Sequence, residues 1–418
     1  MNMSKLILAT CLIAGSLLPW KTFGQLTISE FLYSAVEDPE VKTFTEQVSY
    51  LDGKPYRTSP LQKLEVRMQN RELAYNQQEL ALRVNPANPW ELRNKNLYFK
   101  DVQKSLSLER QVILKEALIE RYYNVVMFMY LTELKAYNDS MQFNLEQQLA
   151  IQEKQYASSY FDADEYVKLK VEELDNRVEV EEVDYELADQ RHLINRLYPK
   201  AHKSVLHWDL NALINVNRIE QLVDSLTRFS VMSSLVLYEK QMIKVAQSEY
   251  NLERSNINLG FFQTEFDQRR IDQNRTPINL SFGVTIPITN PNKGDMAKRK
   301  LEMIESQYNM EEAAHESETD KIIIQDKLST LLVRYRNLEK RITDLKKNNF
   351  AQTLSTIKGG DPLIVAQFNQ RLGKLNDLLI KIKCNILLTY VDYLAFSDHL
   401  QQQPLVNFLS PTLEPIRP

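Results

Sequence analysis

The sequence has long stretches with no glycine and no proline. Only nine glycines occur in 418 residues, and none lies between Gly53 and Gly260. Proline is absent from residues 90–198, 200–276 and 292–361. Glycine costs about 1 kcal/mol relative to alanine inside a helix, and proline removes a backbone donor and clashes with the preceding turn. These absences indicate very long helices and exclude a fold built on many tight turns.

Long apolar runs are also scarce, and the one that exists lies at the start of the chain. Residues 1–24 contain Lys5, an apolar run and a small residue, Gly24, at their end, a pattern typical of a cleaved secretory signal. Lipidation at Cys11 is a poorer alternative, because Thr10 precedes it and the apolar run continues past it. No later run reaches the roughly 18 apolar residues of a membrane helix. The mature chain is therefore expected to stay in the periplasm or to enter a membrane as strands.

Reactive and ligand-binding residues are few. Cys384 is the only cysteine after the predicted signal, which excludes an internal disulfide. The net charge of −4, with basic residues spread along the chain, gives no sign of nucleic-acid binding. His202 and His207 near Asp209 are the closest approach to a metal cluster, and a surface position explains them better because metal ligands need a preorganised shell. No phosphate-binding loop or nucleophile elbow occurs. We expect no catalytic site, no metal and no cofactor.

Helical and strand patterns follow the same order in the two halves of the chain, which predicts a mainly α, tandem-duplicated protein. A helix is expected from Ser29 to about residue 51, interrupted near Pro39, and another at 61–76. The expected first repeat, 25–208, then contains a short strand segment at 78–84, a long helix at 89–158 and a helix at 164–198. The expected second repeat, 209–403, contains strands at 257–268 and 277–289, a long helix at 294–357 and a helix at 362–400, before a Pro-rich, irregular tail at 404–418.

Apolar residues of the long helices recur at steps of three and four. One such seam comprises Leu118, Tyr122, Val125 and Met129, and another comprises Ile324, Leu328, Leu331, Tyr335, Leu338, Ile342 and Leu345. Seams of this spacing pack against neighbouring helices as coiled coils. The sequence therefore predicts paired helices that form a rod or tube.

One segment, INLSFGVTIPI at 278–288, alternates apolar residues with polar, small or proline residues. It is either a half-buried strand of a soluble sheet or a strand facing a bilayer. The few other strand segments leave its edges unpaired unless several chains join, and membranes require closed edges. We favour the membrane interpretation, with a lipid-facing row made of Ile278, Leu280, Phe282, Val284, Ile286 and Ile288.

Acidic residues gather at 162–189, where twelve occur against Lys168, Lys170 and Arg177. A solvated helix face is the usual explanation of such a run. The alternative is an acidic lining near a channel entrance that favours cations. Seven-residue spacing keeps four of the carboxylates on one side of a supercoiled helix; they are Glu165, Glu172, Glu179 and Glu186.

The whole pattern resembles the TolC family of outer-membrane efflux proteins. The likeness rests on LTISEFLYSAVEDPEV at 26–41, on INLSFGVTIPI followed by NPNKGD at 290–295, and on the helix breaks at 156–167 and 353–363. It implies a homotrimer in which strands form an outer-membrane β-barrel and helices form a periplasmic tube. It further implies a passive exit duct for small molecules or polypeptides, joined to a periplasmic adaptor and an inner-membrane pump. One departure is that the first repeat offers only the short strand segment 78–84.

By the same resemblance, the helix breaks are the periplasmic tip where an adaptor docks. The residues concerned are Tyr156, Ser159, Glu165, Ser355, Gly359, Gly360 and Asp361. Serine stands at Ser159 and Ser355 where the family usually has glycine, and helix capping alone explains Asp361 before Pro362. The rival to a duct is a periplasmic coiled-coil scaffold without a complete barrel. The two differ in whether 77–85 and 257–270 align beside 278–288.

Overall fold

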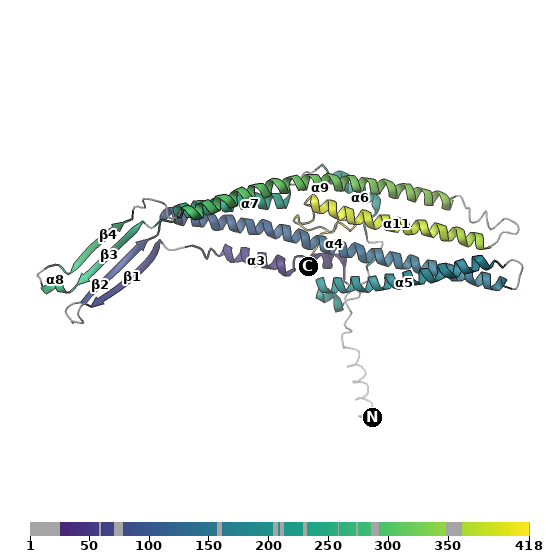
Figure 1. Cartoon of the computed structure of the whole chain (residues 1–418), viewed down its shortest axis with the longest axis horizontal. Coiled ribbons are helices and arrows are strands. Elements are labelled where there is room, and N and C mark those ends of the chain that lie inside the picture. Colours follow the sequence, from purple (N-terminus) through teal and green to yellow (C-terminus); the bar gives the residue numbers. More distant parts are fainter. Residues whose placement is uncertain are drawn as a thin grey trace, which may run out of the picture.

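Long helices run side by side and lead into a β-sheet at one end of the molecule (Figure 1). The computed structural model describes residues 26–57, 60–70, 78–156, 161–203, 208–209, 213–228, 232–257, 259–272, 275–285, 292–347 and 362–417. The described elements are α2 (Ile28–Tyr33), α3 (Pro39–Asp52), β1 (Leu61–Asn70), β2 (Gln78–Pro86), α4 (Pro89–Gln155), α5 (Ala163–Leu197), the 3-10 helix η1 (Pro199–Lys203), α6 (Val216–Leu226), α7 (Ser234–Ser255), β3 (Gly260–Asp267), α8 (Arg269–Asp272), β4 (Ile278–Val284), α9 (Lys293–Lys347) and α11 (Pro362–Phe396).

Local capping signals determine where the main helices begin. The Asn88 side chain accepts a hydrogen bond from Trp90 N at 3.0 Å, and Pro89 occupies the first helical position of α4. Asp38 and Pro39 begin α3 in the same way. With 67 residues, α4 is about 100 Å long at 1.5 Å per residue. The rod expected from the lack of glycine and proline is therefore present.

The central helix is α4, which packs against α3, α5, α7 and α11, while α9 packs against α7 and α11. The seam of α4 at Leu118, Tyr122, Val125 and Met129 is buried. The seam of α9 is buried at Leu328 and Ile342 but leaves Leu345 37% exposed. The largest core cluster lies where α2, α4, α6, α11 and the C-terminal segment meet.

The C-terminal tail is part of this core. It contains little regular structure, yet Leu405, Leu409 and Ile416 are buried. Tyr122 Oη of α4 donates to Val406 O at 2.9 Å and accepts a hydrogen bond from Phe408 N at 3.1 Å. A proline-rich composition indicates irregular backbone, but it does not say whether that backbone is buried.

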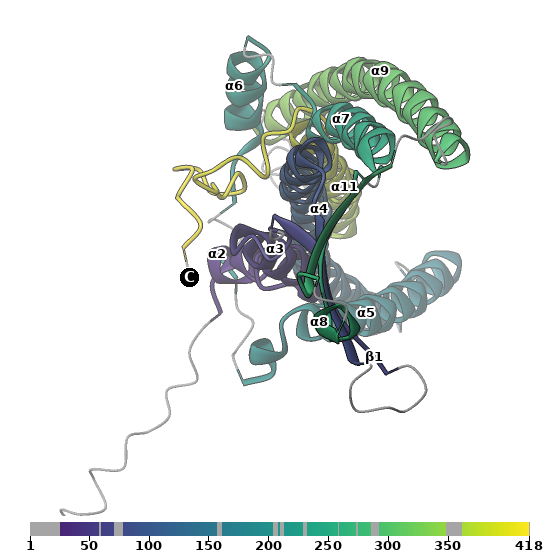
Figure 2. The same ribbon diagram turned by 90° about the vertical axis from the view of Figure 1, so that its left-hand side faces the viewer.

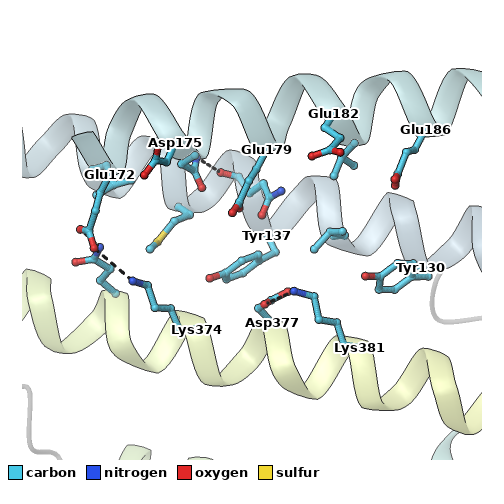
Figure 3. Close-up of a pocket in the computed structure, with 17 residues that line it drawn as sticks. Tyr130, Tyr137, Glu172, Asp175, Glu179, Glu182, Glu186, Lys374, Asp377 and Lys381 are labelled. Atoms are coloured by element: carbon cyan, nitrogen blue, oxygen red, sulfur yellow. Dashed lines mark hydrogen bonds and ion pairs between the residues drawn. The ribbon is translucent and has the colours of Figure 1, made fainter. Parts of the chain in front are cut away.

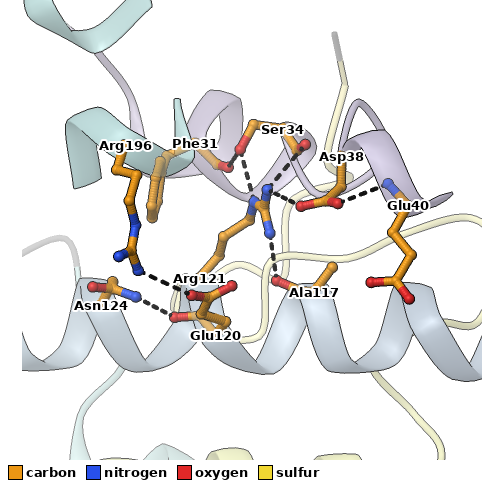
Figure 4. Close-up of polar contacts among 9 residues, drawn as sticks. All are labelled: Phe31, Ser34, Asp38, Glu40, Ala117, Glu120, Arg121, Asn124 and Arg196. Carbon is orange, nitrogen blue, oxygen red and sulfur yellow. Dashed lines mark hydrogen bonds and ion pairs between the residues drawn. The ribbon is translucent and has the colours of Figure 1, made fainter. Parts of the chain in front are cut away.

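A polar cluster joins the start of the chain to α4 (Figure 4). Arg121 is 1% exposed and donates from Nη2 to Asp38 Oδ2 at 2.9 Å and from Nε to Ser34 Oγ at 2.8 Å. Its Nη1 donates to Ala117 O at 2.9 Å. A buried guanidinium is costly unless it is paired, and these contacts satisfy it. The loop between α2 and α3 is thereby held on α4.

The sheet has four antiparallel strands in the order β1-β2-β3-β4. The expectation of a helix at 61–76 is wrong for 61–70, which form β1. In that segment Leu64, Val66 and Met68 alternate with charged residues that also favour helices, and pairing with β2 decides the outcome. Two strands therefore come from each half of the chain, and β2, β3 and β4 align side by side.

The two faces of the sheet differ in chemistry, and the strands form one curved layer (Figure 2). One face is apolar and exposed; it carries Leu64, Val66, Met68, Leu80, Leu82, Phe262, Phe266, Ile278, Leu280, Phe282 and Val284. The other face carries charged and polar residues such as Lys63, Glu65, Arg67, Arg83 and Glu265. None of the described helices combines the length and hydrophobicity needed to span a bilayer.

Candidate functional site: an acidic groove and an apolar sheet face

A groove of roughly 690 Å³ runs between α5 and α11, with α4 as its floor (Figure 3). The floor comes from the apolar seam of α4, and the two walls are polar. The lining residues are Tyr130, Leu134, Tyr137, Asn138, Met141, Leu145, Glu172, Asp175, Asn176, Glu179, Glu182, Val183, Glu186, Gln370, Lys374, Asp377 and Lys381.

The charges of the groove are unbalanced. Lys381 pairs with Asp377 at 2.8 Å on α11 itself, and Lys374 lies 3.4 Å from Glu172 across the groove. Gln370 Nε2 donates to the other oxygen of Glu172 at 2.6 Å. The other carboxylates of the α5 wall have no basic partner among the described residues; these are Asp175, Glu179, Glu182 and Glu186. The groove therefore attracts cationic groups.

Two tyrosines on the floor are neutral hydrogen-bonding groups. Burial, and then the nearby Asp377 and Glu179, raise the pKa of Tyr137 to about 12. Burial, and then nearby groups that include Asp377 and Glu186, raise the pKa of Tyr130 to about 12. Both phenols stay protonated at neutral pH, so the floor adds no negative charge to the acidic wall.

The four heptad-spaced glutamates all lie toward α11. Glu172, Glu179 and Glu186 line the groove, and Glu165 Oε1 accepts a hydrogen bond from Gln367 Nε2 at 2.7 Å. Sequence spacing identified their shared side but not their partners on α11, which lie about 200 residues away along the chain. Whether this side faces a pore stays a prediction.

At the tip of the α4–α5 pair, Tyr156 is 74% exposed. Its ring centroid lies 5.0 Å from that of Phe161, which lies 5.8 Å from Tyr166. Phe161 and Tyr166 are not among the predicted tip residues, although three aromatic residues so close to a helix break were a usable signal. Ser159, Ser355, Gly359, Gly360 and Asp361 lie outside the described residues.

One acidic residue of α5 is buried rather than exposed. Glu173 is 1% exposed and contacts Lys170 at 3.0 Å, Arg177, and Gln142 of α4 at 2.9 Å. The hydrogen bonds from Lys170 and Gln142 and the adjacent cations lower the pKa of Glu173 below its ordinary value of 4.5. This carboxylate therefore belongs to the contact between α4 and α5.

Replacing Glu173 with glutamine is expected to destabilise the α4–α5 pair by about 1–2 kcal/mol, because hydrogen bonds to a charged acceptor are lost. Because the pKa of Glu173 is lower in the folded state, its ionised side chain contributes fully to stability at pH values above the unfolded-state pKa of 4.5. This contribution is lost as the pH falls through the lower, folded-state pKa. Unfolding followed at pH 7 and at pH 3 should therefore show a smaller difference in stability at pH 3 than at pH 7. The exposed Glu181, changed to glutamine, is the control and should unfold like wild type at both pH values.

The predicted lipid-facing row lies on the exposed apolar face of the sheet. Ile278, Leu280, Phe282 and Val284 are 62%, 63%, 81% and 71% exposed. Ile286 and Ile288 lie outside the described residues. The other three strands add apolar residues to this face, which is larger than a few scattered surface side chains. Such a face requires an apolar environment or a partner.

The fold is similar to solved outer-membrane proteins despite low sequence identity. A membrane protein from Pseudomonas aeruginosa matches with a TM-score of 0.65 and 10% identity over 91% of this chain and 93% of that chain. The CmeC outer membrane channel of Campylobacter jejuni matches with a TM-score of 0.64 and 11% identity over 91% and 87%. The outer membrane protein VceC of Vibrio cholerae matches with a TM-score of 0.62 and 8% identity over 88% and 96%. No protein-family model and no curated protein matches the sequence.

The chain has the fold of TolC-like outer-membrane channels. In this TolC-like fold the order α3, β1, β2, α4, α5 is repeated as α7, β3, β4, α9, α11. The resemblance inferred from the sequence is therefore confirmed, and the apparent lack of a strand in the first half is corrected by β1. Among the described residues, no group of metal-ligating side chains could hold an ion.

Proposed function

We propose that the protein is an outer-membrane channel of an export system, a passive duct through which solutes leave the periplasm. The observation that carries this proposal is the four-stranded sheet, which is apolar and exposed on one face and polar on the other. A soluble sheet of this kind would bury its apolar face, whereas a membrane barrel turns that face to lipid and its polar face to a lumen.

A homotrimer would complete the barrel. Among the described residues, β1 and β4 are the outer strands of the sheet, and open sheet edges are not tolerated in lipid. Three chains of four strands make twelve, a number that can close a barrel. The described strands are seven to ten residues long, close to the roughly 9–11 residues of a tilted crossing.

An exposed apolar row on α5 also supports assembly with further copies. Val167, Val171, Leu174 and Val178 follow steps of four, three and four and are 60%, 52%, 48% and 63% exposed. This is the spacing of a coiled-coil seam, and no helix among the described residues of the same chain covers it. A neighbouring copy that covers it would extend the pairs of helices into a closed tube.

The proposed location is the outer membrane, with the helices in the periplasm. Energy for export would come from an inner-membrane pump, reached through a periplasmic adaptor, because the sequence has no nucleotide-binding motif. The adaptor would dock at the tips of the helix pairs, around Tyr156 and Glu165. No catalytic step is assigned to the chain.

The test is fractionation followed by conductance. Full-length protein expressed with its own signal should enter the outer-membrane fraction as a trimer that dissociates on heating, and the purified trimer should form channels in planar lipid bilayers. Recovery as a soluble periplasmic monomer would instead support the rival, a coiled-coil scaffold.

The acidic series provides a separate prediction about ion preference. Changing Glu165, Glu172, Glu179 and Glu186 to glutamine is expected to lower the cation-to-anion permeability ratio by about 2–5-fold, because the carboxylates would no longer concentrate cations at the entrance. Reversal potentials in a KCl gradient measure this ratio. An unchanged ratio would mean that these residues form only a solvated face. The exposed Glu181 and Glu316, changed to glutamine, should leave the ratio unchanged.

A further inference from the structure

The polar face of the sheet contains an arginine, Arg83, that no carboxylate of the described residues neutralises. Arg83 of β2 lies directly opposite Glu65 of β1, a position in which a cross-strand ion pair is expected. Glu65 is instead engaged by its own strand, because Lys63 contacts its Oε1 and Arg67 Nη2 lies 2.9 Å from its Oε2. Among the described residues, no acidic side chain forms an ion pair with Arg83.

The aromatic ring of Phe261 holds Arg83 in place. The guanidinium carbon lies 3.7 Å from the centroid of this ring, a close cation–π contact. The ring in turn lies over Gly283, where a Cβ atom would come within 2.5 Å of Phe261 Cε1. Glycine at this position on β4 therefore makes room for the ring. Residues of β2, β3 and β4 thus fix the position of the Arg83 side chain on the polar face of the sheet.

Stacking leaves the hydrogen-bonding edge of Arg83 available. A guanidinium contacts an aromatic ring through its flat face, while its N–H groups lie in the plane and can bind a carboxylate or a phosphate in a forked manner. The Arg83 guanidinium forms no hydrogen bond with a described residue; its Nε is buried, so its two Nη groups are the donors that a ligand can reach. A fixed cation with unused donors is a binding site for an anionic group.

The surroundings of Arg83 fit such a ligand. Gln263 lies opposite Arg83 on β3, and Ser281 lies opposite Gln263 on β4, so this row continues with neutral hydrogen-bonding groups. The nearest acidic residue of the neighbouring strand, Glu265, pairs with Ala81, about 7 Å along the sheet at 3.3 Å per residue. On the β3 side, an anion bound at Arg83 therefore meets neutral groups before it meets Glu265, and on the β1 side the carboxylate of Glu65 is already paired with Lys63 and Arg67.

We propose that Arg83 and Phe261 form an anion-binding site in the lumen of the barrel, which takes carboxylate or phosphate groups of exported solutes. This inference rests on the proposed channel and names the class of solute that it recognises. Arg83 lies six residues before the start of α4, so three copies form a ring of cations near the helical end of the barrel. Anionic solutes would bind transiently to this ring of cations as they pass through the barrel.

The experiment uses the full-length protein in planar bilayers of zwitterionic lipid, with sodium tripolyphosphate in both compartments as the probe. Wild-type channels should show concentration-dependent block. In R83Q the half-blocking concentration should rise about 10-fold or more, because a charge-assisted contact with the phosphate is lost. In F261L it should rise about 3-fold, because the charge remains but the supporting ring is lost. R67Q is the matched control: it removes the same charge from the same face, but one already paired with Glu65, and should change block by less than about 3-fold.

The outcomes separate the site from the channel. Loss of block in R83Q channels that still conduct, with block retained in R67Q, supports the site. Equal block of wild type and R83Q overturns the anion-binding site and leaves the channel proposal intact. A loss of block in R67Q as large as that in R83Q has the same consequence, because block then depends on net charge alone. Failure of the wild-type protein to form any channel overturns the channel itself, and the inference with it.

Discussion

Replacing Leu280 with arginine is expected to abolish assembly of the protein in the outer membrane. Leu280 is 63% exposed and lies in the middle row of the apolar face, which runs through Val66, Leu82, Thr264 and Leu280. An arginine at the midplane of a barrel's lipid face costs about 2–4 kcal/mol, and three copies would therefore cost about 6–12 kcal/mol per trimer. The measurement is the amount of heat-dissociable trimer in the outer-membrane fraction.

The control for this prediction is the adjacent residue on the same strand. Asn279 points to the polar face, so N279R introduces the same charge where it can remain hydrated, and trimer should accumulate as in wild type. If L280R assembled as well as N279R, the apolar face would not contact lipid, and the channel proposal would lose its main support.

The second large effect, a loss of folding stability, is expected when Arg121, the buried arginine of α4, is replaced. In R121M, Asp38 and Ser34 lose their partner, and breaking a buried ion pair from one side costs about 3–5 kcal/mol. Asp38 is 24% exposed, so part of its charge can be rehydrated and the lower end of this range applies. Chemical denaturation, monitored by circular dichroism at constant protein concentration, measures the change.

A neighbouring ion pair supplies the comparison for Arg121. Arg196 is 70% exposed and lies 4.0 Å from Glu120 (Figure 4), so R196Q should cost less than about 0.5 kcal/mol. The double variant with D38N should be less destabilised than the sum of the single variants, because the two residues act as one unit. The buried pair would not hold the α2–α3 loop on α4 if the losses of unfolding free energy in R121M and D38N were additive. The same would follow if R121M and R196Q lost similar amounts of unfolding free energy.

Much of the helical architecture could be read along the chain. The start of α4 at Pro89 follows from Asn88 and the missing glycines, and the strand at β4 follows from strict alternation. These are local effects, in which backbone dihedrals and caps depend on residues a few positions apart. The shared side of Glu172, Glu179 and Glu186 also follows from a periodicity within one helix.

Other features could not be read locally. Residues 61–70 contain both an alternating pattern and good helix formers, and only hydrogen bonding to β2 makes them a strand. The burial of the tail depends on Tyr122, nearly 300 residues away. At the candidate site, sequence spacing did not reveal that Lys374 and Gln370 face Glu172, or that Glu173 is buried against α4.

The sequence alone therefore determined which segments are helices of unusual length, where the main ones begin, that the plan is duplicated, and that one strand carries an apolar face. Each of these depends on chain stiffness, capping or periodicity within a short window. The tertiary structure decided that four strands form one sheet with two unlike faces, that an acidic groove forms between α5 and α11, and that Arg83 stacks on Phe261 while Glu65 is engaged elsewhere. These features join residues from both halves of the chain or from different strands, and such pairings depend on packing and cross-strand hydrogen bonds that no local pattern specifies.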